Sequence, residues 1–526
     1  MSDNKRHILQ VGFTNLYKDS TVPEQIVWHW IKPEEVTDFV TTELTLRKEN
    51  AKRRQKKLDI MQEDTQFSAL LLTESTYDAS VMELAELIEP YEVFYPKDLH
   101  PQSTVLKDFL HMQMAQLVDV TDKSALMRDF KKYLFSGQYG AKLPVVDLAI
   151  SEEFFGEFCY EGNRYAVLTG NFHYYYHQIA TFRYNVSISK DIALKLWLEH
   201  VTEDMNAIQL HVQLIPSGSL GDISQEWIFD NEDLKEPVEI NVDQDGVLSV
   251  SIYAKGYGTL KIGPLHYRFS RGSFGEFILG GQRYADASGQ EFMTYFNPGD
   301  FKPPLNVYFS GFRSAEGFEG YWMMKSMGAP FLLICDPRIL GGAFYLGSKT
   351  YENAIVSKIQ EALDFLTFDN HQLILSGLSM GTFGALYYGA QLLPHAIVVG
   401  KPLVNLGTMA EKERLSRPNG FPTSLDLLQS QENSDSVLAI NHLNQRFWKP
   451  FKQADFSQTK LALAYMKDDD YDGEAFAQII QETKEQKVKI IGKGWLGRHN
   501  DNSPAINNWF IKQYHHILKQ DFGREL

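Results

Sequence analysis

The chain has 526 residues, 44% of them hydrophobic and 22% charged, which is the composition of a globular protein with more than one domain. A formal net charge of −16 argues against a nucleic-acid partner. Two cysteines, Cys159 and Cys335, form no metal or redox motif, which indicates a reducing compartment. Without a signal-peptide pattern or an apolar run of about 18 residues, the sequence predicts a cytoplasmic protein with no transmembrane helix.

The first part of the chain, residues 1–140, alternates strand and helix patterns. Apolar runs predict strands at 7–12, 67–73 and 92–95, and helical spacing predicts a helix at 78–88. This order predicts a small three-layer α/β domain. No G-x-G-x-x-G motif follows the first strand, so we expect no dinucleotide site there.

Lysine and arginine gather in one stretch of this first domain. Such a cluster could contact anionic lipid or an acidic partner, which would place the protein peripherally at the inner face of the membrane. Acidic neighbours at Glu43, Glu49 and Asp59 favour a solvated helix face instead, and we prefer that interpretation. The cluster consists of Arg47, Lys48, Lys52, Arg53, Arg54, Lys56 and Lys57.

Residues 145–285 have a different sequence pattern, in which turn residues separate many short β-rich runs. The pattern predicts a β-sandwich, an architecture that often binds carbohydrate. The aromatic run Phe172–Tyr176 could stack on sugar rings, but aromatic residues more often fill the core, and we prefer that interpretation. The predicted strands are 164–168, 178–188, 192–200, 208–215, 238–242, 248–252 and 258–262.

Residues 290–526 alternate buried strands with helices, which predicts an α/β-hydrolase fold with a mostly parallel sheet. Residues 402–458 are too long for a simple crossover and predict an insertion that caps the site. Within this domain Gly377-Leu-Ser379-Met-Gly381 lies between a strand and a helix, as a nucleophile elbow does. The alternative is an ordinary glycine-rich turn. The predicted strands are 305–310, 331–335, 372–376, 395–399, 460–466 and 487–491.

Partners for Ser379 follow it in the order acid, then histidine. A carboxylate run after the strand at 460–466 supplies the acid, and we choose Asp469, with Asp468, Asp470 and Asp472 as alternatives. His499 lies in a glycine-rich loop between the last strand and the last helix, although a surface loop histidine would look the same. His515 and His516 on that helix are expected to be structural. Ser379 would attack an acyl carbonyl, His499 would move its proton, and Asp469 would orient the imidazole.

The backbone amides that would stabilise an oxyanion are predicted from the same fold. Met380 N–H, directly after the nucleophile, is one, and Phe312 N–H, in the loop after the strand at 305–310, is the other. Arg313 beside Phe312 could orient a substrate, but a salt bridge to Glu316 or Glu319 is the interpretation that we prefer. The sequence indicates no metal site and no cofactor, and the acyl donor is not readable from it.

Several segments together resemble a known family, the second of the accessory secretion proteins of the accessory Sec system in Gram-positive bacteria. The resemblance covers the whole chain and is most specific from residue 306 onward. It rests on His7–Gly12, Asn306–Gly320, the Ser379 elbow, Met466–Asp472 and Gly494–Asn500.

This resemblance implies a cytoplasmic protein that works in the export of serine-rich repeat glycoprotein adhesins. Its partners would be the first and third accessory secretion proteins, the accessory Sec motor and channel, and the glycosylated adhesin. It also implies O-acetylation of N-acetylglucosamine on the adhesin by a serine triad that maps onto Ser379, Asp469 and His499. Two alternatives stay open: a simple carbohydrate esterase or deacetylase, and a scaffold of the export complex without catalysis.

Overall fold

The computed structural model describes residues 5–18, 21–55, 64–203 and 205–525. The chain divides into two compact units, and each is described by itself. The first comprises residues 1–138 with 191–193 and 270–281. The second comprises 139–190, 194–269 and 282–526. Among the described residues, no helix is long and apolar enough to cross a membrane.

The first unit is built on a five-stranded parallel sheet of order β2-β1-β3-β4-β5. Side chains alternate along β3, so Leu70 and Leu72 pack under α1 and α2, whereas Ala69 and Leu71 pack under α3. Helices therefore cover both faces, as the sequence pattern predicts. The elements are β1 (Arg6–Val11), β2 (Ile26–Ile31), α1 (Val36–Gln55), β3 (Phe67–Leu72), β4 (Val93–Pro96), α2 (Thr104–Met112), β5 (Gln116–Val118), α3 (Lys123–Tyr133), β17 (Gly275–Glu276) and β18 (Ile278–Leu279).

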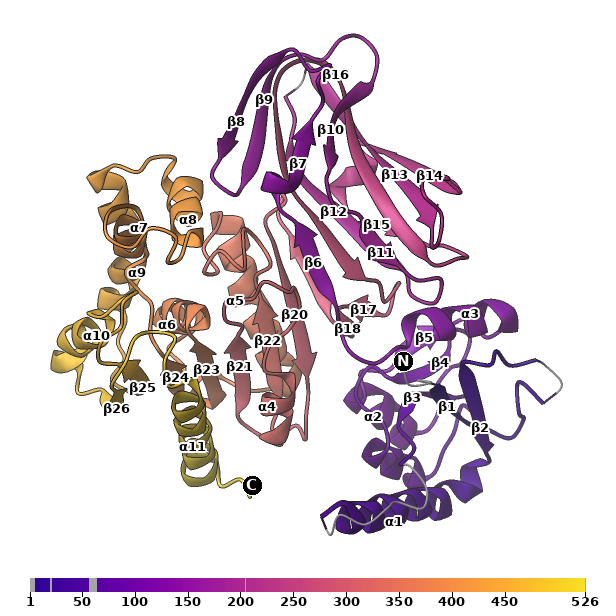
Figure 1. Cartoon of the computed structure of the whole chain (residues 1–526). Coiled ribbons are helices and arrows are strands. Elements are labelled where there is room, and N and C mark those ends of the chain that lie inside the picture. Colours follow the sequence, from indigo (N-terminus) through magenta and orange to yellow (C-terminus); the bar gives the residue numbers. More distant parts are fainter. Residues whose placement is uncertain (1–4, 19–20, 56–63, 204, 526) are drawn as a thin grey trace. The chain divides into compact units, whose positions relative to one another are not determined.

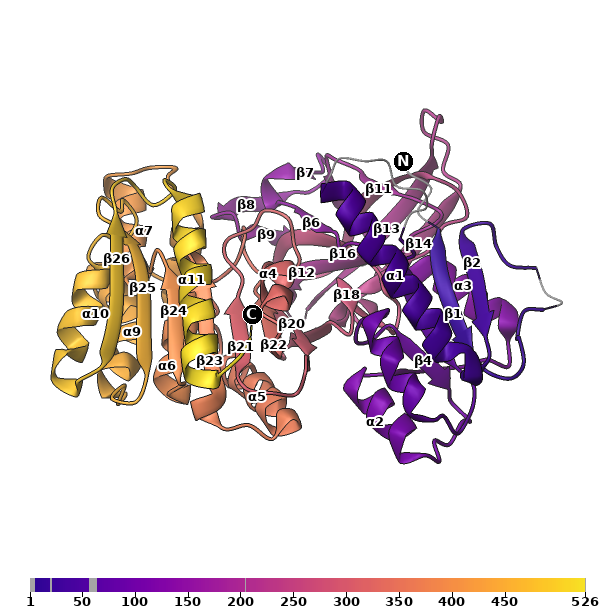
Figure 2. The same ribbon diagram turned by 90° about the horizontal axis from the view of Figure 1, so that it is seen from below.

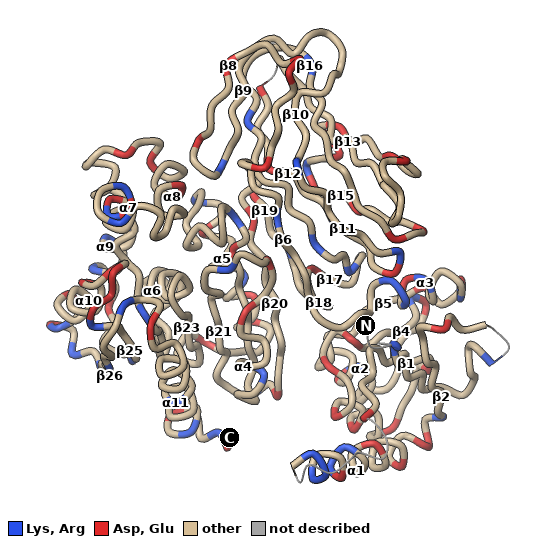
Figure 3. Tube along the Cα trace, in the orientation of Figure 1, with Lys and Arg blue, Asp and Glu red and all other residues tan. Residues whose placement is uncertain are grey.

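Two features of this unit concern the sequence predictions. The helix expected at 78–88 is a 3₁₀ helix over Ala79–Glu86. The basic cluster lies along α1, where acidic and basic residues are mixed (Figure 3). Arg47 donates to the Thr65 carbonyl at 2.9 Å and Arg54 pairs with Asp64 at 2.7 Å, whereas Lys56 and Lys57 lie outside the described residues.

The second unit contains an eleven-stranded β region organised by one long strand, β16. Its first half pairs with β10, β11 and β13, and its second half with β6, β9 and β12, so two layers share this strand. Apolar side chains fill the space between the layers. The strands are β6 (Gly140–Leu143), β7 (Leu148–Ile150), β8 (Gly156–Glu161), β9 (Tyr165–Asn171), β10 (His177–Phe182), β11 (Val186–Ile188), β12 (Leu194–Val201), β13 (Asn206–Pro216), β14 (Gln225–Asp230), β15 (Val238–Ile240) and β16 (Gly246–Phe269).

The aromatic run at 172–176 divides between core and surface. Phe172 is buried and stacks on Phe154 with ring centroids 5.5 Å apart. Tyr174 and Tyr175, in the turn between β9 and β10, are 94% and 85% exposed. The expectation that these aromatics fill the core is right for Phe172 and wrong for the two tyrosines, because the chain leaves the sheet after β9.

The second unit also contains an eight-stranded sheet of order β19-β20-β22-β21-β23-β24-β25-β26. The six strands from β21 to β26 run parallel and are those that the sequence predicts. The antiparallel strands β19 and β20 extend this sheet and were not predicted, and β19 precedes residue 290. The strands are β19 (Gln282–Ala285), β20 (Glu291–Asn297), β21 (Leu305–Phe309), β22 (Phe331–Cys335), β23 (Leu373–Leu378), β24 (Ala396–Gly400), β25 (Lys460–Met466) and β26 (Lys489–Trp495).

Helices cover both faces of this sheet. Figure 1 and Figure 2 show α6 and α9 on one face and α11 on the other, where α11 contacts β24 and β25. Three helices, α7 to α9, lie within residues 402–458, so the long connection after β24 is a helical insertion. The helices are α4 (Tyr321–Ser326), α5 (Lys349–Leu366), α6 (Met380–Leu392), α7 (Leu406–Leu415), α8 (Thr423–Glu432), α9 (Val437–Gln453), α10 (Ala475–Thr483) and α11 (Ser503–Phe522).

Candidate active site

Ser379 lies at the sharp turn between β23 and α6. Its φ of 51° and ψ of −119° are strained for a residue with a side chain, a cost of about 1–3 kcal/mol that the surroundings must offset. A Cβ at Gly377 would lie 2.3 Å from the Gly381 carbonyl oxygen, and a Cβ at Gly381 would lie 2.0 Å from the Phe309 carbonyl oxygen. Both glycines are therefore required by close backbone approach, as the elbow motif predicts.

Ser379, His499 and Asp469 form one line of hydrogen bonds. The Ser379 Oγ lies 2.8 Å from His499 Nε2, and His499 Nδ1 lies 2.8 Å from Asp469 Oδ2. An ionised carboxylate can only accept, so Nδ1 carries the ring proton and Nε2 accepts from the serine hydroxyl. His499 is buried, with 1% of its surface exposed. The structure thus brings together the three residues that the sequence selects.

The four candidate carboxylates have different partners. Asp469 also accepts the Tyr471 and Asp472 amides, at 2.9 and 3.2 Å. Burial alone would raise the pKa of Asp469, but the hydrogen bonds from His499 and from these amides outweigh burial and lower it. Asp468 accepts from the Gly497 amide, and Asp470 from the His499 amide. Asp472 accepts from Val404 and Asn405, and burial raises its pKa.

The two predicted oxyanion donors lie at the ends of neighbouring strands. Met380 is the first residue of α6, and amides in the first turn of a helix have no acceptor within the helix. Phe312 follows β21, where Glu319 holds the preceding Gly311 amide at 2.6 Å. The expected salt bridge from Arg313 to Glu316 or Glu319 is wrong, because in the described part of the chain Arg313 pairs with neither carboxylate. Arg313 donates to the Phe318 carbonyl, and the Glu316 carboxylate binds Lys142, His266 and Arg268.

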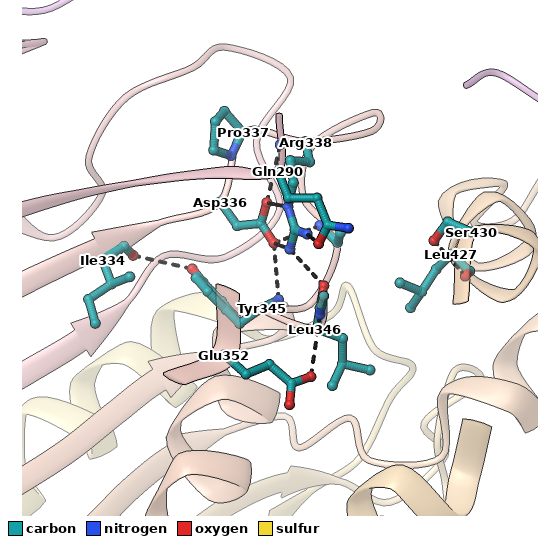
Figure 4. A network of polar contacts seen from close by, with 12 residues as sticks. Gln290, Ile334, Asp336, Pro337, Arg338, Tyr345, Leu346, Glu352, Leu427 and Ser430 are labelled. Carbon is teal, nitrogen blue, oxygen red and sulfur yellow. Dashed lines mark hydrogen bonds and ion pairs between the residues drawn. The ribbon is translucent and has the colours of Figure 1, made fainter. Parts of the chain in front are cut away.

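A buried ion pair that sequence analysis missed fixes the loop after β22 (Figure 4). Arg338 pairs with Asp336 at 2.7 Å and donates to the Leu346 carbonyl. Asp336 in turn accepts the Ala343 and Tyr345 amides, each at 3.0 Å. The Tyr345 hydroxyl donates to the Ser310 carbonyl at 2.6 Å, so this loop supports the end of β21 that leads to Phe312.

Two further residues near His499 were not predicted. The ring of Tyr471 stacks on the His499 imidazole, with centroids 4.5 Å apart and planes inclined by 16°. The Arg417 guanidinium, from the helical insertion, lies 4.2 Å from the Tyr471 ring centroid. Tyr471 stands in the carboxylate run and Arg417 in a polar loop, so neither carries a sequence motif. In the described part of the chain, no group of three His, Cys, Asp or Glu residues could hold a metal ion.

The mostly parallel sheet, the serine at a strained strand-to-helix turn and the His–Asp pair behind it define an α/β-hydrolase-like protein with a serine–histidine–aspartate arrangement. The family model described as the accessory Sec system GspB-transporter matches residues 6–524, and the chain belongs to this family. The family resemblance seen in the sequence is therefore confirmed.

Individual relatives are similar in sequence to this chain over most or all of its length. The chain is 39% identical to the second accessory secretion protein of the accessory Sec system of Streptococcus gordonii, over 99% of both chains. It is 43% identical to the corresponding protein of Staphylococcus aureus, over 86% of this chain and 87% of the relative. A chain in the solved glycosylation-associated protein (Gap123) complex of Streptococcus agalactiae is 50% identical, with a TM-score of 0.93 over 100% of both chains.

Proposed function

We propose that this protein acts in accessory Sec export of serine-rich repeat glycoprotein adhesins and transfers acetyl groups to N-acetylglucosamine on the adhesin glycan. The observation that carries the catalytic half is the line of hydrogen bonds from Ser379 Oγ through His499 to Asp469. The family and the full-length relatives support the export half.

The geometry suits a two-step acyl transfer. Ser379 Oγ attacks the acetyl carbonyl of a donor while His499 Nε2 takes the hydroxyl proton and passes it to the leaving group. A sugar hydroxyl then gives its proton to Nε2 and attacks the serine ester, and the proton returns to Ser379. Asp469 holds the ring tautomer throughout, and the Met380 and Phe312 amides would face the developing oxyanion.

A second candidate function is hydrolysis by a carbohydrate esterase or deacetylase. It uses the same three residues, with water in place of the sugar hydroxyl as the second nucleophile. The helical insertion favours transfer, because Arg417 lies against the loop that carries Asp470 and Tyr471 and a cover of this kind limits the access of water. If the protein hydrolyses acetyl esters and an added sugar acceptor takes none of the acetyl groups, the result would favour hydrolysis.

The proposed partners are the first and third accessory secretion proteins, the accessory Sec motor and channel, and the glycosylated adhesin. A relative that is 50% identical was solved as part of the Gap123 complex, which supports assembly with companion proteins. Such a complex would act at the inner face of the membrane. A scaffolding role is compatible with catalysis, because the first unit contains none of the residues that we assign to the reaction.

The deciding experiment is mass spectrometry of the glycans on a co-expressed adhesin. We expect Ser379→Ala and His499→Ala to remove the acetyl mass, and the exposed Ser457→Ala and the distant His395→Ala, whose imidazole pairs with Asp521, to retain it. The amount of exported adhesin is measured in the same cultures. Unchanged glycans in both triad variants would overturn the acetyltransferase, and unchanged export with lost acetyl groups would separate scaffolding from catalysis.

A further inference from the structure

The helical insertion contributes a short loop, residues 417–421 between α7 and α8, that contacts the candidate site on two sides. On one side Phe421 stacks on Tyr471, with centroids 5.5 Å apart. On the other side Phe421 meets Phe312, the predicted oxyanion residue, at 5.4 Å. The Tyr471 hydroxyl also donates to the Gly420 carbonyl at 3.3 Å. One loop therefore contacts both the histidine side and the oxyanion side of Ser379.

Arg417 at the start of this loop reaches His499 by two routes. In the first, its guanidinium lies on the Tyr471 ring, which itself stacks on the imidazole. In the second, it pairs with Asp470 Oδ2 at 2.9 Å, and Asp470 Oδ1 accepts the His499 backbone amide at 3.0 Å. Both partners of this ion pair are partly shielded from solvent, with 31% and 23% of their side chains exposed. Arg417 thus restrains the ring and the backbone of the same histidine.

The ion pair also sets the charge around the imidazole. Asp469 and Asp470 approach His499 from the loop after β25, and Arg417 balances Asp470. From the end of β24, Lys401 interacts electrostatically with Asp469 and with Asp501, and its ammonium donates to Ser503 at 3.0 Å. With Arg417 removed, Asp470 would stand beside the histidine as an unbalanced carboxylate, which favours the imidazolium and leaves less of the base needed to activate Ser379.

We propose that Arg417 is a positioning residue, supplied by the helical insertion, that holds His499 in register with Ser379 through Tyr471 and Asp470. This inference rests on the proposed nucleophilic role of Ser379.

A fluorophosphonate probe tests the proposal without a known acyl donor, because it reports the rate at which the activated serine forms a covalent bond to phosphorus as fluoride leaves. The labelling rate is measured from pH 5 to pH 9 on the full chain. For Arg417→Ala we expect the labelling rate to reach a plateau about tenfold lower. We expect the midpoint of its pH dependence to lie about half a pH unit higher, because a partly buried charge a few ångströms from the imidazole has an effect of about this size. Arg417→Lys should restore most of the midpoint, because it restores the charge, but not the plateau, because it lacks the planar stack.

The matched control is Arg414→Ala, from the same insertion, whose ion pair with the exposed Asp435 involves neither Tyr471 nor Asp470. This variant should have the same labelling rate and the same pH midpoint as the wild-type protein. A second variant, Tyr471→Ala, should lower the plateau without raising the midpoint, since Arg417 and Asp470 remain. Thermal melts identify any variant that fails to fold. Wild-type rate and midpoint in Arg417→Ala would overturn the positioning role alone. If the wild-type protein were labelled no faster than the Ser379→Ala variant, the proposed function itself would be overturned.

Discussion

Two buried histidines in the second unit, His499 and His266, have opposite surroundings. His499 has one carboxylate on Nδ1 and the Ser379 hydroxyl on Nε2, each at 2.8 Å. His266 has Glu316 on Nδ1 at 2.5 Å and Glu199 on Nε2 at 2.9 Å. Its neighbour Arg268 also binds Glu316, at 2.6 Å. The same side chain is therefore placed between an acid and an alcohol in one region and between two acids in the other.

This difference separates a candidate base from a structural cation. Burial by itself lowers the pKa of His266, but its two carboxylate partners outweigh burial and raise it. A doubly donating imidazolium between two acceptors satisfies both carboxylates and has no free nitrogen to accept a proton. His499 keeps Nε2 as an acceptor because a hydroxyl, and not a second acid, faces it. The number of acids, rather than burial, decides what each histidine can do.

The largest expected effect separates the two histidines directly. His499→Ala should lower fluorophosphonate labelling of Ser379 by at least about 10⁴-fold, because the serine loses its base. His266→Ala should leave the labelling rate of the folded protein within about tenfold and lower its thermal unfolding midpoint instead. Labelling rates and melts of both variants check this, and equal losses of labelling would contradict the assigned roles.

The next effect distinguishes the carboxylates on the His499 loop. Asp469→Asn should cost about 10³- to 10⁴-fold in labelling, because an amide that donates to Nδ1 fixes the wrong tautomer. Asp470→Asn should cost about tenfold or less, since it loses one ion pair but can still accept the His499 amide. Comparable losses in the two variants would mean that the acid of the triad is not Asp469 alone.

A smaller effect, on stability, belongs to the His266 region. Glu316→Gln leaves Arg268 and His266 without a shared anion in a buried site and should lower the free energy of unfolding by about 3 kcal/mol. Chemical denaturation measures this loss. The exposed Glu232→Gln, which breaks the surface pair with Lys235, is the control and should change stability by less than about 1 kcal/mol. A loss no larger than that of the control would show that the network contributes little.

The smallest effect is a pH dependence. Because the pKa of His266 is raised in the folded state, its contribution to stability is complete below its ordinary value of about 6.5 and is lost as the pH rises through the folded-state pKa. We expect the stability difference between wild type and His266→Gln, and with it the difference in melting midpoint, to shrink over this rise. Melts from pH 6 to pH 9 check this, and a difference that does not change with pH would contradict it.

Much of the parallel sheet that carries the candidate site could be predicted because each strand is a short apolar run with a strong boundary. The runs ending near Phe309, Leu378 and Met466 mark strand ends, and loops at the ends of parallel strands meet at one edge of the sheet. The elbow glycines, the carboxylate run and His499 follow three of these strands. Local sequence and sheet topology were therefore enough to bring Ser379, His499 and the acidic run together.

The remaining features depend on contacts between distant segments. To choose Asp469 over Asp470, one must know which way each side chain in the loop faces. The spacing of the residues in the sequence does not give this information. Arg417 lies more than fifty residues before its partner Asp470, and no motif links them. The strands β19 and β20 were missed because their pattern continues that of the preceding β region, although their partner is β22.

The ion network around Glu316 has a consequence for how this protein can be divided or recombined. Glu291 and Glu316 belong to the segment that builds the hydrolase-like sheet, whereas Arg268 and His266 come from β16 and Lys142 from β6. A fragment that begins at residue 290 would keep two buried acids and discard the cations that neutralise them. The segment that builds the eight-stranded sheet therefore needs β16 and β6 beside it, and gene fusions that exchange one without the other should yield chains that fold poorly.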